Sequence, residues 1–258
     1  MAMLSTPRGM FNVVVEGQRD APVLMFSNSL GTTLDMWNSQ VAALGEYLCI
    51  VRYDTRGHGD SIVSSGAYQI SDLAEDAVAI MDALELRQVN FCGLSMGGMI
   101  GLWLGMHAPF RINRLVVANS AAQIAPPQLW NDRIATVRAN GMSVIAEGVG
   151  QRWFTADFIG REPETVNAIK QMIIGTPVEG YASCCAAVRD FDMRDGMGKI
   201  ALPVLVIAGE SDPATPPHLT QKIAQAIVGS HFETLPAAHL SNIECPGAFS
   251  RLLHDFLK

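Results

Sequence analysis

The chain has 258 residues, of which 49% are hydrophobic and 17% charged, and this composition indicates a compact globular protein with a large core. Its formal net charge of −7 disfavours nucleic acids and anionic membranes as partners, because an acidic surface repels phosphate groups. No run approaches the roughly 18 apolar residues of a membrane helix, and no signal-peptide run is found, so we expect a cytoplasmic protein. The five cysteines show no metal-binding spacing and are expected to be reduced.

Short apolar runs alternate with helical patterns through the first half of the chain. Strands are expected at residues 11–16, 23–27, 47–53, 89–92 and 115–118. Helices are expected at residues 71–86 and 99–107. Two later strands, at 204–208 and 231–235, are each followed by a loop and a helical pattern. This alternation predicts an α/β fold, with a mostly parallel sheet covered by helices on both faces.

Between residues 119 and 195 the alternation stops, and the sequence shows helical spacing without strand-like runs. We therefore expect an α/β core formed by residues 1–119 and 196–258, and a helical cap formed by residues 120–195. Ligands of open α/β sheets bind at the carboxyl ends of the strands, and the cap is expected to lie over that edge. The cap should consequently contribute to the binding site.

The pentapeptide at residues 93–97, GLSMG, fits the pattern G-x-S-x-G and lies between an expected strand and an expected helix. A serine on such a tight turn needs small neighbours, because the backbone is strained and other chain segments approach closely. The helix that follows Ser95 offers unpaired N–H groups to a developing oxyanion. This context predicts that Ser95 is a catalytic nucleophile.

A serine hydroxyl needs a base to activate it, and the base needs an acid that orients it. On this fold the chain order is serine, acid, histidine, and Asp212 and His239 follow the last two expected strands in that order. Glu210 is close to Asp212, but Asp212 lies deeper in the turn. His58 also follows a strand and remains a competing base, although it precedes the serine. The predicted triad is therefore Ser95, Asp212 and His239.

The tetrahedral intermediate of such a reaction needs two backbone donors for its oxyanion. The N–H of Met96 follows the nucleophile directly. The loop after the strand at 23–27 reads NSLG, and the N–H of Leu30 in this loop is the natural second donor. Leu30 and Met96 are therefore the predicted oxyanion hole.

Motifs over nearly the whole chain resemble those of the 3-oxoadipate enol-lactonases, a family with the α/β-hydrolase fold. In the core, the matching stretches are NSLGT (28–32) with Met36 and Trp37, RYDTRGHG (52–59), GLSMGG (93–98), GESDPATPP (209–217) and AHLSNIE (238–244). In the expected cap, they are RIATVRANG (133–141) and RWFT (152–155). Many α/β-hydrolases have His-Gly in place of Asn28-Ser29, and related carbon–carbon bond hydrolases usually have Asn in place of Leu94. Both differences favour the lactonase family.

The resemblance implies an enzyme of bacterial aromatic catabolism that opens a five-membered enol-lactone with a carboxymethyl arm, without a metal or organic cofactor. The substrate carboxylate needs a cation, and we expect a cap arginine to bind it, Arg133 ahead of Arg138. Trp130 and Trp153 are expected to wall the pocket. A broad carboxylesterase, a carbon–carbon bond hydrolase with the same triad, and a non-catalytic ligand receptor remain alternatives. Oligomeric state is not predicted by the sequence.

Overall fold

A computed structural model describes residues 2–124 and 126–258 of the chain. Within these residues one sheet has eight strands in the order β1-β2-β4-β3-β5-β6-β7-β8. β1 pairs antiparallel with β2, and β2 with β4, while all other pairs are parallel. The strands span Ala2–Thr6 (β1), Gly9–Gly17 (β2), Val23–Ser27 (β3), Cys49–Tyr53 (β4), Val89–Leu94 (β5), Ile112–Ala118 (β6), Val204–Gly209 (β7) and His231–Leu235 (β8). The predicted α/β fold with a mostly parallel sheet is confirmed.

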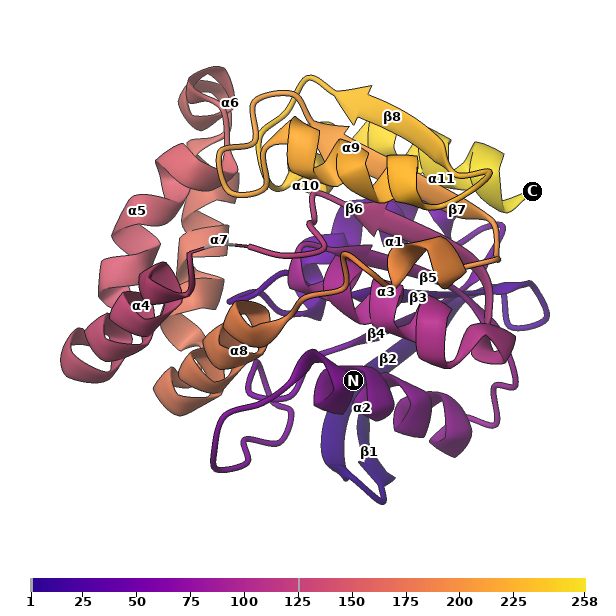
Figure 1. The fold of residues 1–258 in the computed structure, drawn as a ribbon, viewed down its shortest axis with the longest axis horizontal. Helices are drawn as coiled ribbons and strands as arrows, with labels where there is room; N and C mark the ends of the chain where they lie inside the picture. Colours follow the sequence, from indigo (N-terminus) through magenta and orange to yellow (C-terminus); the bar gives the residue numbers. More distant parts are fainter. Residues whose placement is uncertain (1, 125) are drawn as a thin grey trace.

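Helices cover both faces of this sheet (Figure 1). The helices of the first half are η1 (Leu34–Trp37), α1 (Asn38–Leu44), α2 (Ile70–Ala83), α3 (Met96–His107) and η2 (Pro109–Arg111). Those of the last part are η3 (Met197–Lys199), α9 (Pro217–Ala226), α10 (Ser241–Glu244) and α11 (Pro246–Leu257). In Figure 1, α2, α3 and α9 lie in front of the sheet and α1 and α11 lie behind it. The central strands β4, β5 and β7 are therefore buried along their whole length, as parallel strands usually are.

The strand β1 was not expected from the sequence. It is a five-residue strand without clear alternation, and it forms because the turn at Pro7 and Arg8 folds it back on β2. Such pairing depends on the partner strand rather than on the strand's own pattern. This hairpin extends the sheet at the edge far from β8, which leaves the position of the site unchanged.

In the part of the chain that the structure describes, five α-helices lie between β6 and η3, and Figure 1 shows them together beside the sheet. They are α4 (Pro127–Asn140), α5 (Ser143–Trp153), α6 (Ala156–Arg161), α7 (Pro163–Gly175) and α8 (Val178–Asp190), and we call them the insert helices. α4 packs against α8, and α5 packs against α7. The division into a core of 1–119 and 196–258 and a cap of 120–195 stays a prediction. In the described residues, no helix has the length and apolar character that crossing a membrane requires.

Candidate active site

Ser95 lies on the turn that joins β5 to α3, with a backbone φ of 59°. This left-handed conformation is costly for a residue with a side chain, and the surrounding backbone holds it in place. A Cβ atom on Gly93 would overlap the carbonyl group of Gly97, and one on Gly97 would overlap the backbone of Ser27. Both glycines of the pentapeptide are therefore needed for close packing, and the turn presents Ser95 at the end of β5.

Asp212 and His239 lie in the loops that follow β7 and β8, and their side chains meet. The Nδ1 atom of His239 is 2.8 Å from the Oδ2 atom of Asp212, and both residues are buried. This contact fixes the ring of His239 so that its Nε2 atom is free to act on another group. The predicted acid and base are thus brought together, whereas Glu210 contacts the Thr234 hydroxyl at an exposed position.

The carboxylate of Asp212 is surrounded by donors. Its Oδ1 atom accepts hydrogen bonds from the N–H groups of Ala214 and Thr215, and its Oδ2 atom accepts from the Thr215 hydroxyl and the Asn119 amide at 2.7 and 3.0 Å. Burial alone would raise the pKa of Asp212. The charge and hydrogen bond of His239, together with the other donors, outweigh burial and lower this pKa from 3.8 to about 2. Asp212 is therefore an anion at neutral pH.

Ser95 and His239 both line a cavity of about 320 Å³. Leu30 lines it as well, and among the described residues the Leu30 N–H has no acceptor. The loop that carries Leu30 is joined to the nucleophile turn, because the Gly97 N–H donates to the carbonyl of Asn28 at 3.0 Å. Met96 is the first residue of α3, so its N–H is one that a helix leaves free. The arrangement can provide two backbone donors beside the serine.

The insert helices contribute two arginines to the same cavity, Arg133 from α4 and Arg152 from α5. Arg133 is half-buried, and its guanidinium lies 4.8 Å from the ring centroid of Trp130. Arg152 is exposed on one side, but the protein packed around it and the positive charge of Arg133 lower its pKa. In the described residues neither arginine has an ion-pair partner, although Asp132 also borders the cavity. Two arginines that line one cavity favour an anionic ligand.

The comparisons with known proteins agree with this geometry. A family model described as the alpha/beta hydrolase fold matches residues 22–246. The chain belongs to the α/β-hydrolase family. It is 44% identical to 3-oxoadipate enol-lactonase 2 of Acinetobacter baylyi, over 96% of this chain and 92% of that protein, and 40% identical to 3-oxoadipate enol-lactonase 1 of the same bacterium, over the same shares. The crystal structure of the enol-lactonase from Burkholderia xenovorans LB400 superposes with a TM-score of 0.97, at 41% identity over 99% of both chains.

These matches confirm the resemblance to the 3-oxoadipate enol-lactonases and the prediction of a hydrolase. Within this α/β-hydrolase, Trp130 and Trp153 line the cavity, and the Trp153 ring lies 6.1 Å from the ring of His239. Arg138 does not line it. Its guanidinium is exposed and pairs with Glu179 at 2.8 Å, so it is not the second candidate for binding the substrate.

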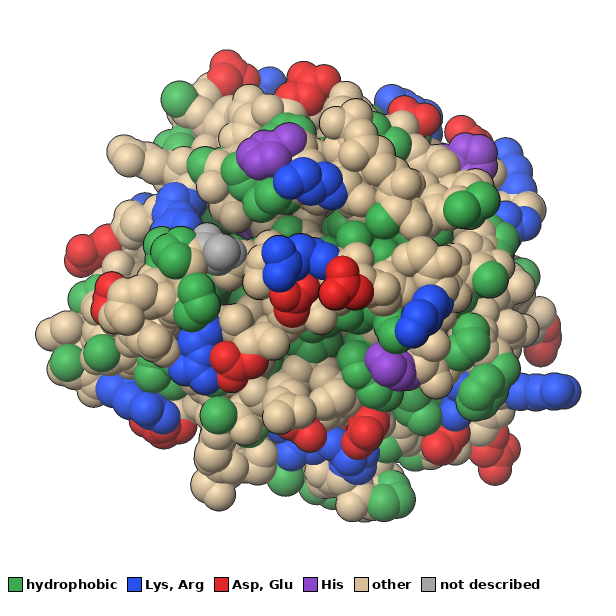
Figure 2. Space-filling model, in the orientation of Figure 1, with side chains coloured by type: hydrophobic (Ala, Val, Ile, Leu, Met, Phe, Trp, Pro, Cys, Tyr) green, Lys and Arg blue, Asp and Glu red, His purple; other side chains and the backbone are tan. Residues whose placement is uncertain are grey.

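Sequence reasoning did not select Arg152. The residue stands at the start of RWFT, one of the stretches that carried the resemblance, but helical spacing alone does not tell which face of α5 borders the cavity. The competing base His58 is fully buried, and among the described residues it is not part of the cavity wall. On the face drawn in Figure 2, basic and acidic side chains are interspersed, so the net charge of −7 is not gathered there into one acidic patch.

Proposed function

We propose that this α/β-hydrolase opens the lactone ring of 3-oxoadipate enol-lactone and releases 3-oxoadipate in bacterial aromatic catabolism, in the cytoplasm. The observation that carries the proposal is one cavity that holds Ser95, His239 and two unpaired arginines. The similarity to enol-lactonases over almost the entire chain supports the same substrate. A lactone with a carboxymethyl arm supplies both the carbonyl that a serine attacks and the anion that the arginines favour.

In the first half of the reaction, the Oγ atom of Ser95 attacks the lactone carbonyl while the Nε2 atom of His239 takes the hydroxyl proton. The N–H groups of Leu30 and Met96 donate to the oxyanion, and each such donor lowers the barrier by about 3 kcal/mol. The ring C–O bond then breaks. The leaving group departs as an enolate, so the bond breaks with little help from an acid. The enolate then takes up the proton that His239 removed from Ser95 and becomes a ketone, which leaves His239 neutral for the second half.

In the second half, His239 removes a proton from water, and the resulting hydroxide attacks the ester carbonyl on Ser95. The bond between the acyl carbon and Oγ breaks, and the proton returns from His239 to Ser95. Throughout, the Asp212 carboxylate holds the ring and stabilises its protonated form. The buried, fully hydrogen-bonded Asp212 is suited to this task because it stays ionised.

Substrate recognition is assigned to residues 120–195, which we propose to act as a cap over the triad. Arg133 and Arg152 bind the carboxymethyl group, and Trp130 and Trp153 form the apolar walls beside the lactone ring. A partly buried arginine can form two parallel hydrogen bonds with a carboxylate, which fixes orientation as well as charge. This placement leaves the lactone carbonyl to face Ser95.

The proposal is tested by following lactone hydrolysis through ultraviolet absorbance, beside hydrolysis of p-nitrophenyl acetate, with wild-type protein and Ser95→Ala. We expect fast turnover of the lactone, weak turnover of the ester, and loss of both in the variant. Ester turnover without lactone turnover would keep the triad and refute the substrate, in favour of a carboxylesterase or a carbon–carbon bond hydrolase. Stoichiometric binding without turnover of either would indicate a receptor.

A further inference from the structure

His58 is a buried histidine for which the proposed reaction has no use. It lies in the loop between β4 and α2, at Asp54–Ser61, and none of its surface is exposed. A buried imidazole needs hydrogen-bond partners, because an unsatisfied polar atom in the interior is costly. The partners of His58 lie in its own loop and in the loop that carries Leu30.

The Nε2 atom of His58 accepts a hydrogen bond from the N–H of Gly31 at 2.8 Å. The Nδ1 atom lies 3.3 Å from the carbonyl oxygen of Arg56. A ring nitrogen that accepts carries no proton, and one that faces a carbonyl must donate, so the ring is neutral with its proton on Nδ1. Burial also lowers the pKa of His58, to about 4, which keeps this neutral form at physiological pH.

Gly31 directly follows Leu30, the proposed oxyanion donor. Its φ of 83° is a left-handed conformation, and a Cβ atom there would lie 3.3 Å from the ring of Tyr181. A glycine in this position is free to adopt other conformations, so the backbone needs an external contact to hold one of them. The hydrogen bond to His58 supplies that contact at the peptide bond that joins Leu30 to Gly31.

The other end of this loop is held separately. The Asn28 carbonyl accepts from the Gly97 N–H, and the Asn28 side chain accepts from the indole of Trp37 at 2.9 Å. Leu30 therefore lies between a contact on the nucleophile turn and the contacts of Gly31, whose N–H donates to His58 and whose carbonyl accepts from the Thr176 hydroxyl at 3.4 Å. Removal of the His58 acceptor would leave the contact with the nucleophile turn in place and free the peptide bond between Leu30 and Gly31.

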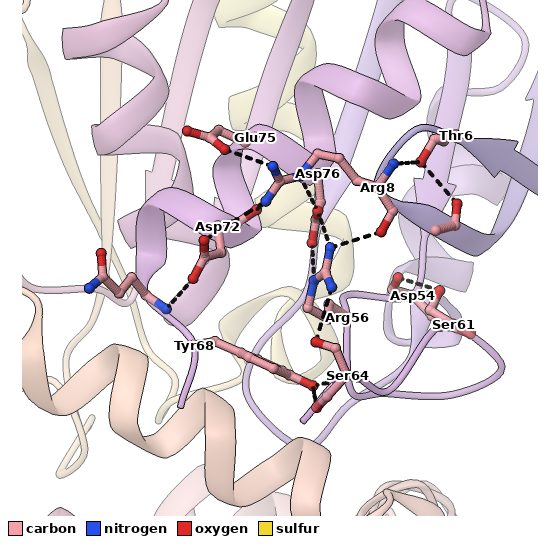
Figure 3. A network of polar contacts seen from close by, with 12 residues as sticks. Thr6, Arg8, Asp54, Arg56, Ser61, Ser64, Tyr68, Asp72, Glu75 and Asp76 are labelled. Carbon is pink, nitrogen blue, oxygen red and sulfur yellow. Dashed lines mark hydrogen bonds and ion pairs between the residues drawn. The ribbon is translucent and has the colours of Figure 1, made fainter. Parts of the chain in front are cut away.

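The loop that carries His58 is itself rigid. Arg56 forms two hydrogen bonds with the buried carboxylate of Asp76, at 2.6 and 2.7 Å, and a third with Ser64 (Figure 3). Asp54 in the same loop accepts hydrogen bonds from Asn12 and from the N–H of Leu34. The Arg56 carbonyl that faces His58 is thus part of a fixed framework, so the position of the ring is determined from outside the active site.

We propose that His58 is a positioning residue for the reaction: through Gly31 it holds the N–H of Leu30 in the orientation that the oxyanion requires. This role rests on the oxyanion hole proposed above, but it does not depend on the lactone being the substrate. If His58 only filled space in the core, any side chain of the same shape could replace it. If His58 is a positioning residue, its replacement must keep an acceptor atom at the place of Nε2.

Two substitutions separate these requirements. In His58→Gln the amide oxygen can occupy the place of Nε2, so the acceptor for Gly31 is retained. In His58→Asn the shorter side chain reaches only the place of Nδ1, so the contact with Arg56 is kept and the acceptor is lost. Loss of an entire oxyanion donor lowers kcat about 10²- to 10³-fold, and we expect a displaced donor to lower it at least about tenfold.

The measurements are kcat and KM for p-nitrophenyl acetate, and the Kd of phenylboronic acid, whose adduct with Ser95 places an oxygen in the oxyanion hole. His58→Asn should lower kcat and weaken boronate binding by similar factors with KM unchanged, and His58→Gln should restore both to within about threefold. Equal losses in the two variants, wild-type values in both, or a rise in KM alone would overturn the proposal. If Ser95→Ala leaves ester turnover intact, the proposed active site fails instead.

A second measurement does not need a variant. The nitrogen-15 spectrum of the wild-type protein at pH 7 should show His58 with an unprotonated Nε2 atom and a proton on Nδ1. A charged ring, or a proton on Nε2, would contradict the proposal even if His58→Asn failed to fold.

Discussion

Replacing the cavity arginines by methionine tests how the substrate carboxylate is recognised. Methionine keeps much of the length and apolar packing of the side chain and removes only the charge and the donors. Arg133 is half-buried between α4 and the cavity, so its hydrogen bond to a carboxylate is only partly screened by water. Such a charge-assisted bond contributes about 1.5–3 kcal/mol. Arg133→Met should therefore raise KM for the lactone by about 10- to 150-fold.

Arg152 is more exposed, and an exposed ion pair contributes about 0.2–1 kcal/mol. We accordingly expect Arg152→Met to raise KM for the lactone only up to about fivefold, and this smaller effect should shrink further at high salt. In both variants kcat should change little, because the carboxylate contact is the same in the ground state and the transition state.

The matched control is Arg138→Met, which removes the same charge from the same helix as Arg133→Met but outside the cavity. It should leave KM for the lactone unchanged. The neutral substrate p-nitrophenyl acetate should have the same KM in all three variants and in the wild-type protein. If Arg133→Met raised KM equally for the lactone and the ester, the variant would have lost the shape of the pocket. If Arg138→Met raised KM for the lactone as much as Arg133→Met does, the overall positive charge of the helix, and not a direct contact with Arg133, would determine binding. Either result would refute the assignment.

Three further outcomes are expected. Asp212→Asn should lower kcat for the ester about 10⁴-fold without unfolding the protein, because the amide favours the wrong tautomer of His239. The pKa of Asp212, about 2, lies below its ordinary value of 3.8, so the ionised carboxylate stabilises the fold above pH 4 by about 2 kcal/mol. Denaturant titrations should show that this contribution to the free energy of unfolding disappears as the pH falls from 4 to 2. The same pH dependence should be absent in Asp212→Asn. Gly93→Ala should yield unfolded protein by circular dichroism, whereas Gly247→Ala on α11, where a Cβ atom meets open space, should fold normally.

The sequence could place the three residues of the proposed triad at one edge of the sheet because the fold imposes a simple rule. Side chains that follow parallel strands gather at one edge of the sheet, so a serine after one strand and an acid and a histidine after two others meet without any detail of packing. Ser95, Asp212 and His239 follow β5, β7 and β8 in this way. Asn119 directly follows β6, so the same rule places it at this edge, whereas the donors of Ala214 and Thr215 depend on the conformation of the loop after β7, which the strand pattern does not give.

The arginines that line the cavity were harder to predict because the direction of each side chain depends on how its helix lies. Arg133 and Arg138 are five positions apart on α4, and at 3.6 residues per turn their side chains point about 140° apart. Only one of them can face the cavity. Arg152 lies on a different helix, and its direction follows from the packing of α5 against α7. His58 was judged by its place after a strand, whereas the loop folds inward and buries it.

Two different parts of the chain divide the work of the site, and hydrogen bonds join them. The triad stands on loops of the sheet, and the arginines stand on the insert helices. The Leu240 N–H, next to His239, donates to the Trp153 carbonyl at the end of α5 at 3.1 Å. The buried Glu244 accepts from the N–H of Ala238 at 2.9 Å and from the N–H of Thr155 at 3.2 Å. A swing of α5 as a free lid would break the contacts of Trp153 and Thr155 with this segment. The base and the wall that carries Arg152 therefore keep one geometry, so a change of arginine alters which anion binds while the triad remains able to react.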